Sequence, residues 1–136
     1  MKELFDVHCH MVPGVDDGAA DLEESLAMLK MQHEDGVRKI IITPHYRMFE
    51  TPAKKVHEQF LKLQEAAKKE YPDMSLYLGC ELHSNMDLQD ILEKRKYVTM
   101  AGSSYVLLEF SEGDSAQHIR ERVYNVLSCG YEPIIA

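Results

Sequence analysis

Two histidines stand two residues apart near the start of the sequence, as His8-Cys9-His10. The segment from Phe5 to His10 predicts a strand. Because successive side chains of a strand point to opposite faces, both imidazoles should point one way and Cys9 the other. Two imidazoles on one face can bind one metal ion, whereas the alternative is a strand end with incidental polar residues.

Further metal-binding groups follow the first two predicted strands. Asp16 and Asp17 stand before a glycine, which is first of all a turn sequence. They fall in the loop after the first strand, where α/β enzymes place their ligands, so a carboxylate here can bind a metal or support a ligand. His45 comes after a proline that ends the strand predicted over 39–43. It should therefore lie at the same sheet edge as His10.

Two glutamates belong to later predicted strands. Glu81 lies near the end of a strand predicted over 75–82, and Glu109 lies inside one predicted over 105–110. A carboxylate in a buried strand is unfavourable unless it is paired or bound to a metal. The apolar neighbours of Glu109 predict that it is buried. A structural salt bridge to an arginine or lysine is the alternative.

The first four predicted strands thus each supply histidine, aspartate or glutamate at or just beyond the C-terminal end. This succession predicts a polynuclear site with nitrogen and oxygen ligands, suited to manganese, iron or zinc and to metal-assisted hydrolysis. The absence of a paired thiolate motif disfavours a structural zinc site. Cys9 and Cys80 are interpreted as small buried side chains. Three other histidines are interpreted as surface or helix-flanking residues: His33, His57 and His118. His83 is interpreted as a residue beyond a strand end and not as a ligand.

The elements that position these groups alternate between strand and helix. The first helix should run from Asp21 as N-cap to Gly36, and the second should begin with Thr51 as N-cap. A short third helix is predicted over 88–94, and a fourth ends near Gly130. The apolar stripes are Leu22, Leu26 and Leu29 in the first helix, Val56, Phe60, Leu63 and Ala67 in the second, and Ile119, Val123 and Leu127 in the fourth. This order predicts an α/β fold with parallel strands and right-handed crossovers.

Composition narrows the class of protein. The chain has 136 residues, 45% hydrophobic and 28% charged, which predicts one soluble globular domain. Its net charge of −8 argues against binding to nucleic acid or to an anionic membrane surface. With no leader and no membrane-spanning run, we expect no membrane insertion and a cytoplasmic location. Three scattered cysteines disfavour a disulfide framework.

The last residues begin a fifth predicted strand, from Glu132 to Ala136. An apolar parallel strand belongs inside a covered sheet, and a natural domain rarely stops within one. We therefore expect the chain to be truncated.

The ordered motifs resemble those of the capsule-associated, metal-dependent protein-tyrosine phosphatases of Gram-positive bacteria, the CpsB/CapC type of the polymerase-and-histidinol-phosphatase (PHP) superfamily. The resemblance covers residues 1–136 in order and at the family spacing, so we expect the N-terminal part of a single PHP-type domain. The segments that carry the resemblance are 6–10 with 13–19, 43–45 with Phe49 to Pro52, 79–81, 107–110 and 130–136.

The resemblance implies a partial, distorted (β/α) barrel and a cluster of up to three metal ions, usually manganese. The implied activity is hydrolysis of phosphotyrosine on proteins, notably a bacterial tyrosine autokinase that controls capsular or exopolysaccharide synthesis. Asp17 fits the family pattern better than Asp16, which is the reserve, and Arg47 is a candidate for phosphate binding. The implied metal ligands are His8, His10, Asp17, His45, Glu81 and Glu109.

The family's next histidine and arginine, and a later Asp-x-His pair, would lie beyond Ala136. A chain without them should be weakly active or inactive alone. A half barrel would expose sheet edges, which predicts association into a homo-oligomer. Two other functions stay open: a different PHP phosphoesterase, such as a histidinol-phosphate phosphatase, and a non-catalytic domain that binds a partner.

Overall fold

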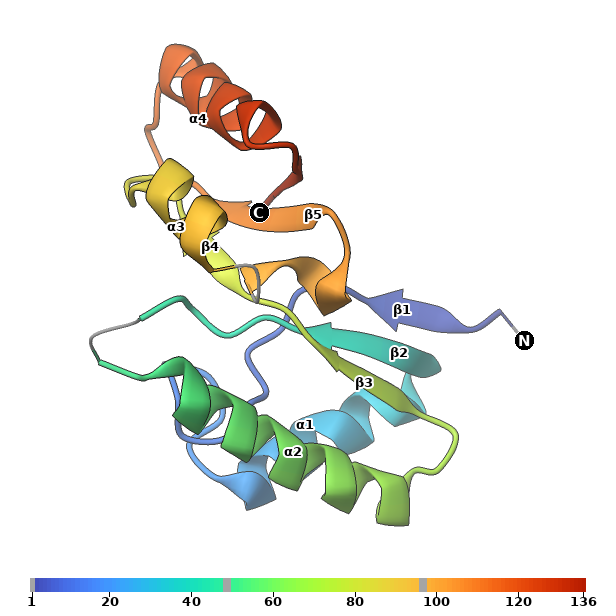
Figure 1. The fold of residues 1–136 in the computed structure, drawn as a ribbon. Coiled ribbons are helices and arrows are strands. Elements are labelled where there is room, and N and C mark those ends of the chain that lie inside the picture. The colour runs from blue at the N-terminus through green and yellow to red at the C-terminus, as the bar shows by residue number, and fades with distance from the viewer. Residues whose placement is uncertain (1, 48–49, 96–97) are drawn as a thin grey trace. The chain divides into compact units, whose positions relative to one another are not determined.

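The computed structural model describes residues 2–47, 50–95 and 98–136. The chain forms two compact units, Met1–Leu78 and Gly79–Ala136, each with a three-stranded sheet (Figure 1). All paired strands within each sheet run parallel. The predicted α/β class with parallel strands is confirmed. Phe49, part of one family motif, lies outside the described residues.

The sheet of unit 1 has the strand order β1-β2-β3, formed by β1 (Leu4–Asp6), β2 (Val37–Ile42) and β3 (Ser75–Leu78). The crossovers are α1 (Leu22–Glu34) and α2 (Ala53–Glu70), which lie on the same side of the sheet (Figure 1). The β-branched run of β2 suits its central place in the sheet.

The limits of α1 follow from its end residues. The Asp21 carboxylate accepts a hydrogen bond from the Glu24 backbone N–H at 2.9 Å, and the Glu24 carboxylate accepts one from the Ala20 N–H at 2.7 Å. These bonds satisfy two backbone donors at the helix start. Gly36, with φ of 91°, follows the helix end. Both predicted limits are confirmed.

The start of α2 differs from the prediction by one residue. Pro52 is the N-cap, and the predicted cap, Thr51, has another role. The Thr51 hydroxyl donates to the Val15 carbonyl at 2.8 Å, so it joins the loop after β1 to the segment that enters α2. The helix therefore begins without a side-chain cap.

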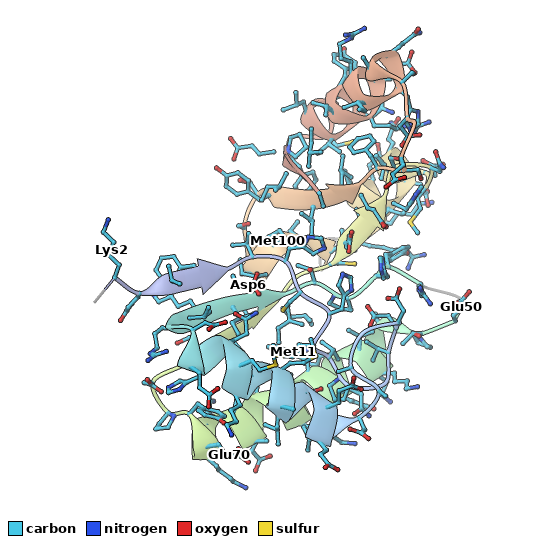
Figure 2. The ribbon with its side chains drawn as sticks, turned by 180° about the vertical axis from the view of Figure 1, so that it is seen from behind. Lys2, Asp6, Met11, Glu50, Glu70 and Met100 are labelled. Atoms are coloured by element: carbon cyan, nitrogen blue, oxygen red, sulfur yellow. The ribbon has the colours of Figure 1, made fainter. Side chains whose placement is uncertain are left out.

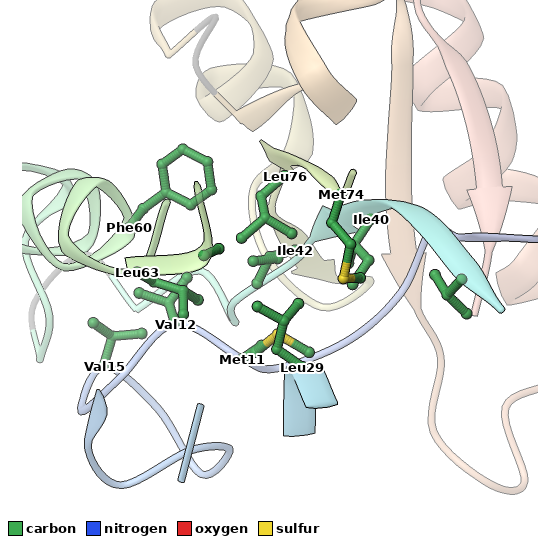
Figure 3. Close-up of a cluster of buried hydrophobic side chains, with 12 residues drawn as sticks. Met11, Val12, Val15, Leu29, Ile40, Ile42, Phe60, Leu63, Met74 and Leu76 are labelled. Carbon is green, nitrogen blue, oxygen red and sulfur yellow. The ribbon is translucent and has the colours of Figure 1, made fainter. Parts of the chain in front are cut away.

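The core of unit 1 lies between the sheet and its two helices (Figure 3). The predicted stripe of α2 is confirmed, since Phe60 and Leu63 are buried and Val56 is partly buried. In α1, Leu29 is buried but Leu22 is exposed, so that part of the prediction is wrong. The segment after β1 adds buried side chains of its own, among them Met11, labelled in Figures 2 and 3.

Unit 2 has the strand order β4-β5-β6, formed by β4 (Glu81–His83), β5 (Tyr105–Glu109) and β6 (Glu132–Ile135). Its other elements are α3 (Leu88–Lys94), the short 3₁₀ helix η2 (Met100–Gly102) and α4 (Ala116–Ser128). No helix in the described ranges is long and apolar enough to cross a membrane.

The strand predicted over 75–82 is wrong as a single strand. Its first part is β3, which pairs with β2, and its last part is β4, which pairs with β5. Gly79 and Cys80 lie between the two strands. A glycine inside a strand weakens the ladder and permits such a change of partner.

The stripe predicted for α4 is also partly wrong. Leu127 is 52% exposed, whereas Val126 is buried. Val126 is seven residues after Ile119 and about 20° from it around the helix, while Leu127 is about 80° away. The helical period therefore places Val126 on the packed face.

We expect Leu63→Ala to lower the free energy of unfolding by about 2–5 kcal/mol, because Leu63 is fully buried in the core of unit 1. Urea unfolding followed by circular dichroism measures the loss. Leu61→Ala is the matched control, since Leu61 lies on the same helix and is exposed. Similar losses for the two variants would contradict the described packing of α2.

Candidate metal centre

The backbone that carries His8 and His10 leaves the sheet earlier than predicted, because β1 ends at Asp6. The Asp6 carboxylate accepts hydrogen bonds from the His8 backbone N–H at 3.1 Å and from the Gln32 amide nitrogen at 2.5 Å. These bonds hold the segment that follows β1. The carbonyl of Cys9, between the two histidines, accepts a hydrogen bond from the Thr43 N–H at 2.8 Å, just after the end of β2.

The two imidazoles lie on one side, as the alternation predicts. Their Nε2 atoms are 3.4 Å apart, and Cys9 packs against the hydrophobic core instead. Two metal–nitrogen bonds of about 2.1 Å at a tetrahedral angle would separate the nitrogens by about 3.4 Å. The spacing of His8 and His10 therefore fits two ligands of one cation.

Asp16 lies behind His10, and its side chain is 0% exposed. Its Oδ2 is 2.9 Å from His10 Nδ1 and accepts from the His45 backbone N–H at 3.0 Å. Its Oδ1 accepts from the Gly18 N–H at 3.0 Å. Burial by itself would raise the pKa of Asp16, but these three hydrogen bonds outweigh it and lower the pKa to about 2. Asp16 is therefore ionised at neutral pH.

Asp17 has the opposite environment. Its side chain is 67% exposed, and its Oδ1 lies 3.3 Å from His45 Nε2. The rings of His10 and His45 lie 4.5 Å apart between centroids. One possible ligand atom from each of four residues lies within 4.8 Å of the others: His10, Asp16, Asp17 and His45. Unit 1 thus brings together a set of nitrogen and oxygen donors suited to a divalent cation.

Gly18 is required by the close approach of this loop to His10. A Cβ atom at position 18 would lie 2.0 Å from the His10 carbonyl oxygen and 2.5 Å from its Cβ. The next residue, Ala19, donates from its N–H to the same carbonyl at 3.0 Å. The Asp-Asp-Gly segment is therefore more than a turn, since each residue has a separate role beside the histidines.

Unit 2 brings together its own pair of carboxylates. Oxygens of Glu81 and Glu109 lie within 4.8 Å of each other. Glu109 is the last residue of β5, but Glu81 is the first residue of β4, so its predicted place near a strand end is wrong. Glu81 is 3% exposed, whereas Glu109 is half-buried, so the expectation that Glu109 is buried is wrong. Two carboxylates this close favour a cation that both can bind, because their charges repel each other.

Hydrogen bonds connect the C-terminal ends of β4 and β5 to each other and to α4. The buried Ser84 donates from its N–H to the Glu109 carbonyl at 2.9 Å, and its hydroxyl lies 3.2 Å from His118 Nε2. His83 is the last residue of β4. The prediction that it lies beyond the strand end is therefore wrong. Its Nδ1 accepts from the Asn85 N–H, and its Nε2 lies 3.1 Å from a serine hydroxyl. These contacts hold the C-terminal ends of the two strands that carry the glutamates.

The sequence did not single out Asp6, Gln32 or Ser84. The role of Asp6 could have been predicted, since an aspartate side chain often accepts a hydrogen bond from the backbone N–H two residues further along. The roles of Gln32 and Ser84 could not, because only the fold brings them to their partners. His33, interpreted as a helix-flanking residue, pairs with Asp73 at 3.0 Å.

Arg47, the candidate for phosphate binding, and Cys9, interpreted as a small buried side chain, lie close to the histidines in sequence. The Arg47 guanidinium lies 3.5 Å from the Glu50 carboxylate, and its side chain is partly exposed. Burial raises the pKa of the Cys9 thiol to about 12, with further contributions from the charges of Asp6 and Asp16. Cys9 is therefore a neutral thiol and not a nucleophile. Cys80 is buried, as predicted.

A family model and several known proteins match nearly the whole chain. The family model for capsular polysaccharide synthesis, CpsB/CapC, matches residues 4–136. The tyrosine-protein phosphatase CpsB of Streptococcus pneumoniae is 40% identical over 135 residues, which are 98% of this chain and 56% of that protein. The tyrosine-protein phosphatase YwqE of Bacillus subtilis is 29% identical over 135 residues, which are 98% of this chain and 53% of that protein.

The fold has a close structural relative. It comes from crystal structures of YwqE from Bacillus subtilis and CpsB from Streptococcus pneumoniae, described as metal-dependent tyrosine phosphatases. The match has a TM-score of 0.85 at 28% identity and covers 97% of this chain and 54% of that chain. The fold is therefore of the PHP type. The chain belongs to the CpsB/CapC family, and it spans about half the length of the relatives it matches.

We expect Gly18→Ala to destabilise unit 1 by about 1–3 kcal/mol and to shift the NMR signals of the His10 ring, because the new methyl group would overlap the His10 backbone. Gly113→Ala is the control: Gly113 has a positive φ of 85° but no close neighbour. Its cost should be conformational, and the His10 signals should stay in place. A stable Gly18→Ala variant with unchanged His10 signals would contradict the described loop.

Proposed function

We propose that this chain is the N-terminal part of a single PHP-type domain of a metal-dependent protein-tyrosine phosphatase. The observation that carries the proposal is the convergence of His10, Asp17 and His45 around the buried Asp16 in unit 1. The names of the relatives supply the reaction, since CpsB and YwqE are tyrosine-protein phosphatases.

The residues present fit a divalent metal. The Nε2 spacing of His8 and His10 suits two ligands of one ion, and the closeness of Glu81 to Glu109 favours a cation. Histidine and carboxylate ligands together suit manganese, iron or zinc, and manganese is our choice from the family resemblance. Bound metal ions supply Lewis acidity, which lowers the pKa of water and neutralises charge on phosphate oxygens. The proposed ligands are His8, His10, Asp17, His45, Glu81 and Glu109.

The chain's own residues bind and orient. Asp6 holds the backbone of His8, and Asp16 holds the ring of His10 and the backbone of His45, so that these segments are in place before a metal arrives. Preorganised ligands lose less conformational entropy on binding. Arg47 is our candidate for contact with a phosphate group, because a guanidinium can bind two phosphate oxygens at once.

Glu109→Gln should weaken metal binding by about a hundredfold or more, since loss of a group that only supports a ligand already costs about 10–100-fold. Calorimetry with Mn²⁺ measures the affinity, and release of phosphate from a phosphotyrosine peptide measures turnover. Glu112→Gln is the matched control, because Glu112 is an exposed glutamate three residues further along. Equal Mn²⁺ affinity in Glu109→Gln and wild type would contradict the ligand role.

The same assay separates the other functions. The relatives' names favour phosphotyrosine over histidinol phosphate as the substrate. Faster release of phosphate from histidinol phosphate than from the peptide would overturn the proposed substrate. Because the chain spans about half the length of its relatives, absence of turnover alone does not separate the functions. Partner binding that stays unchanged in Glu109→Gln would instead support a domain that binds a partner without catalysis.

Arg47→Ala should raise KM for the phosphotyrosine peptide about tenfold and leave Mn²⁺ affinity unchanged, because a charged hydrogen bond contributes about 1.5–3 kcal/mol. Lys54→Ala is the control, since Lys54 is an exposed cation at the start of α2. An unchanged KM in Arg47→Ala would remove Arg47 from the proposal.

A phosphorylated partner, a cellular location and self-association are also proposed. We propose a tyrosine kinase of capsule synthesis as the phosphorylated partner, in line with the family description. A cytoplasmic location is supported by the described cysteines, which form no disulfide. Self-association is supported by Leu4 and Phe5, which are exposed on the edge strand β1. A monomer in sedimentation at micromolar concentration would contradict self-association.

A further inference from the structure

We infer that Asp16 is a positioning residue that couples two proposed metal ligands, and not a ligand itself: one carboxylate oxygen sets the ring of His10 and the backbone of His45. This inference rests on the proposed metal site. It assigns separate roles to the adjacent aspartates, with Asp17 as the ligand.

The hydrogen bonds of Asp16 leave its carboxylate little capacity for a metal. Oδ2 lies 2.9 Å from His10 Nδ1 and 3.0 Å from the His45 N–H, while Oδ1 accepts from Gly18 at 3.0 Å. The side chain is fully buried, whereas that of Asp17 is largely exposed beside His45 Nε2. A cation that approaches from solvent therefore meets Asp17.

The contact with His10 decides which ring nitrogen can bind a metal. A carboxylate can only accept, so Nδ1 of His10 carries the proton that it donates to Asp16. The neutral ring then presents its lone pair at Nε2, the atom that lies 3.4 Å from His8 Nε2. A carboxylate behind a metal-binding imidazole commonly sets the tautomer in this way.

The same oxygen also fixes a second segment of the chain. His45 follows β2 and is 29 residues from Asp16 in sequence, yet its N–H donates to Oδ2. The segment after β1 and the segment after β2 are thus held to one atom. A change at Asp16 should therefore alter the placement of both histidines together.

Asparagine at this position cannot reproduce the bonds. If its oxygen took the place of Oδ2, its NH₂ group would face the Gly18 N–H, and two donors would meet. If its NH₂ group took the place of Oδ2, it would face the His45 N–H and would favour a His10 ring whose Nδ1 accepts. That tautomer carries its proton on Nε2 and blocks the proposed ligand atom.

The experiment compares Asp16→Asn with Asp73→Asn. Asp73 is the matched control, because it also pairs with a histidine, His33, at 3.0 Å, but precedes β3 and so lies at the other ends of the strands. Long-range ¹H–¹⁵N NMR of the metal-free protein, at a pH above which the ring signals no longer change, identifies the tautomer of each neutral ring. Calorimetry with Mn²⁺ gives the dissociation constant.

We expect metal-free wild type to carry the His10 proton on Nδ1. Asp16→Asn should increase the Nε2–H form of His10 and weaken Mn²⁺ binding about 10–100-fold. Asp73→Asn should change neither quantity. A His10 ring with the same tautomer in Asp16→Asn and wild type would overturn the positioning role, and so would an unchanged dissociation constant.

Two further outcomes keep the test decisive. If Asp16→Asn does not fold, wild type alone decides, because an Nε2–H tautomer of His10 would overturn the inference. If wild type binds no Mn²⁺ but Asp16→Asn shifts the tautomer, the proposed metal site fails while the control of the His10 ring by Asp16 stands.

Discussion

A buried carboxylate that must stay ionised is the constraint on which unit 1 depends. Asp16 offers acceptors only, and burial would neutralise it without strong donors. The fold supplies them from His10, His45 and Gly18. Satisfying this one charge draws together the segments that follow β1 and β2, and their histidines with them. The hydrogen bonds that stabilise the loop are thus the same bonds that preorganise the proposed ligands.

Parallel sheets explain why the donors gather where they do. The C-terminal ends of neighbouring parallel strands meet at one edge, and the backbone there is released from the ladder. In unit 1 that edge carries His8, His10 and His45. In unit 2 it carries Glu109, whereas Glu81 is the first residue of the three-residue strand β4. The Asp21 cap limits α1, and buried side chains of α1 and α2 pack both crossovers of unit 1 against its sheet. Within each unit, the elements therefore bring together ligand residues that are far apart in the sequence.

Much of this arrangement can be predicted from the sequence, because it depends on local rules. Alternation on a strand predicts that His8 and His10 share a side, and the proline before His45 marks a strand end. Local rules do not separate Asp16 from Asp17, since they are identical neighbours that only the loop conformation distinguishes, and the choice of Asp17 as the ligand came from the family resemblance alone. The break after Leu78 was also missed, because a change of sheet depends on distant pairing partners and not on periodicity.

The number of metal ions held by each chain tests the proposed ligand set most directly. Purified protein would be loaded with Mn²⁺, dialysed against metal-free buffer and analysed for its elements. Ligands that are already in place predict roughly one tightly held ion or more per chain. Fewer than roughly half an ion per chain would contradict a metal centre formed by this polypeptide.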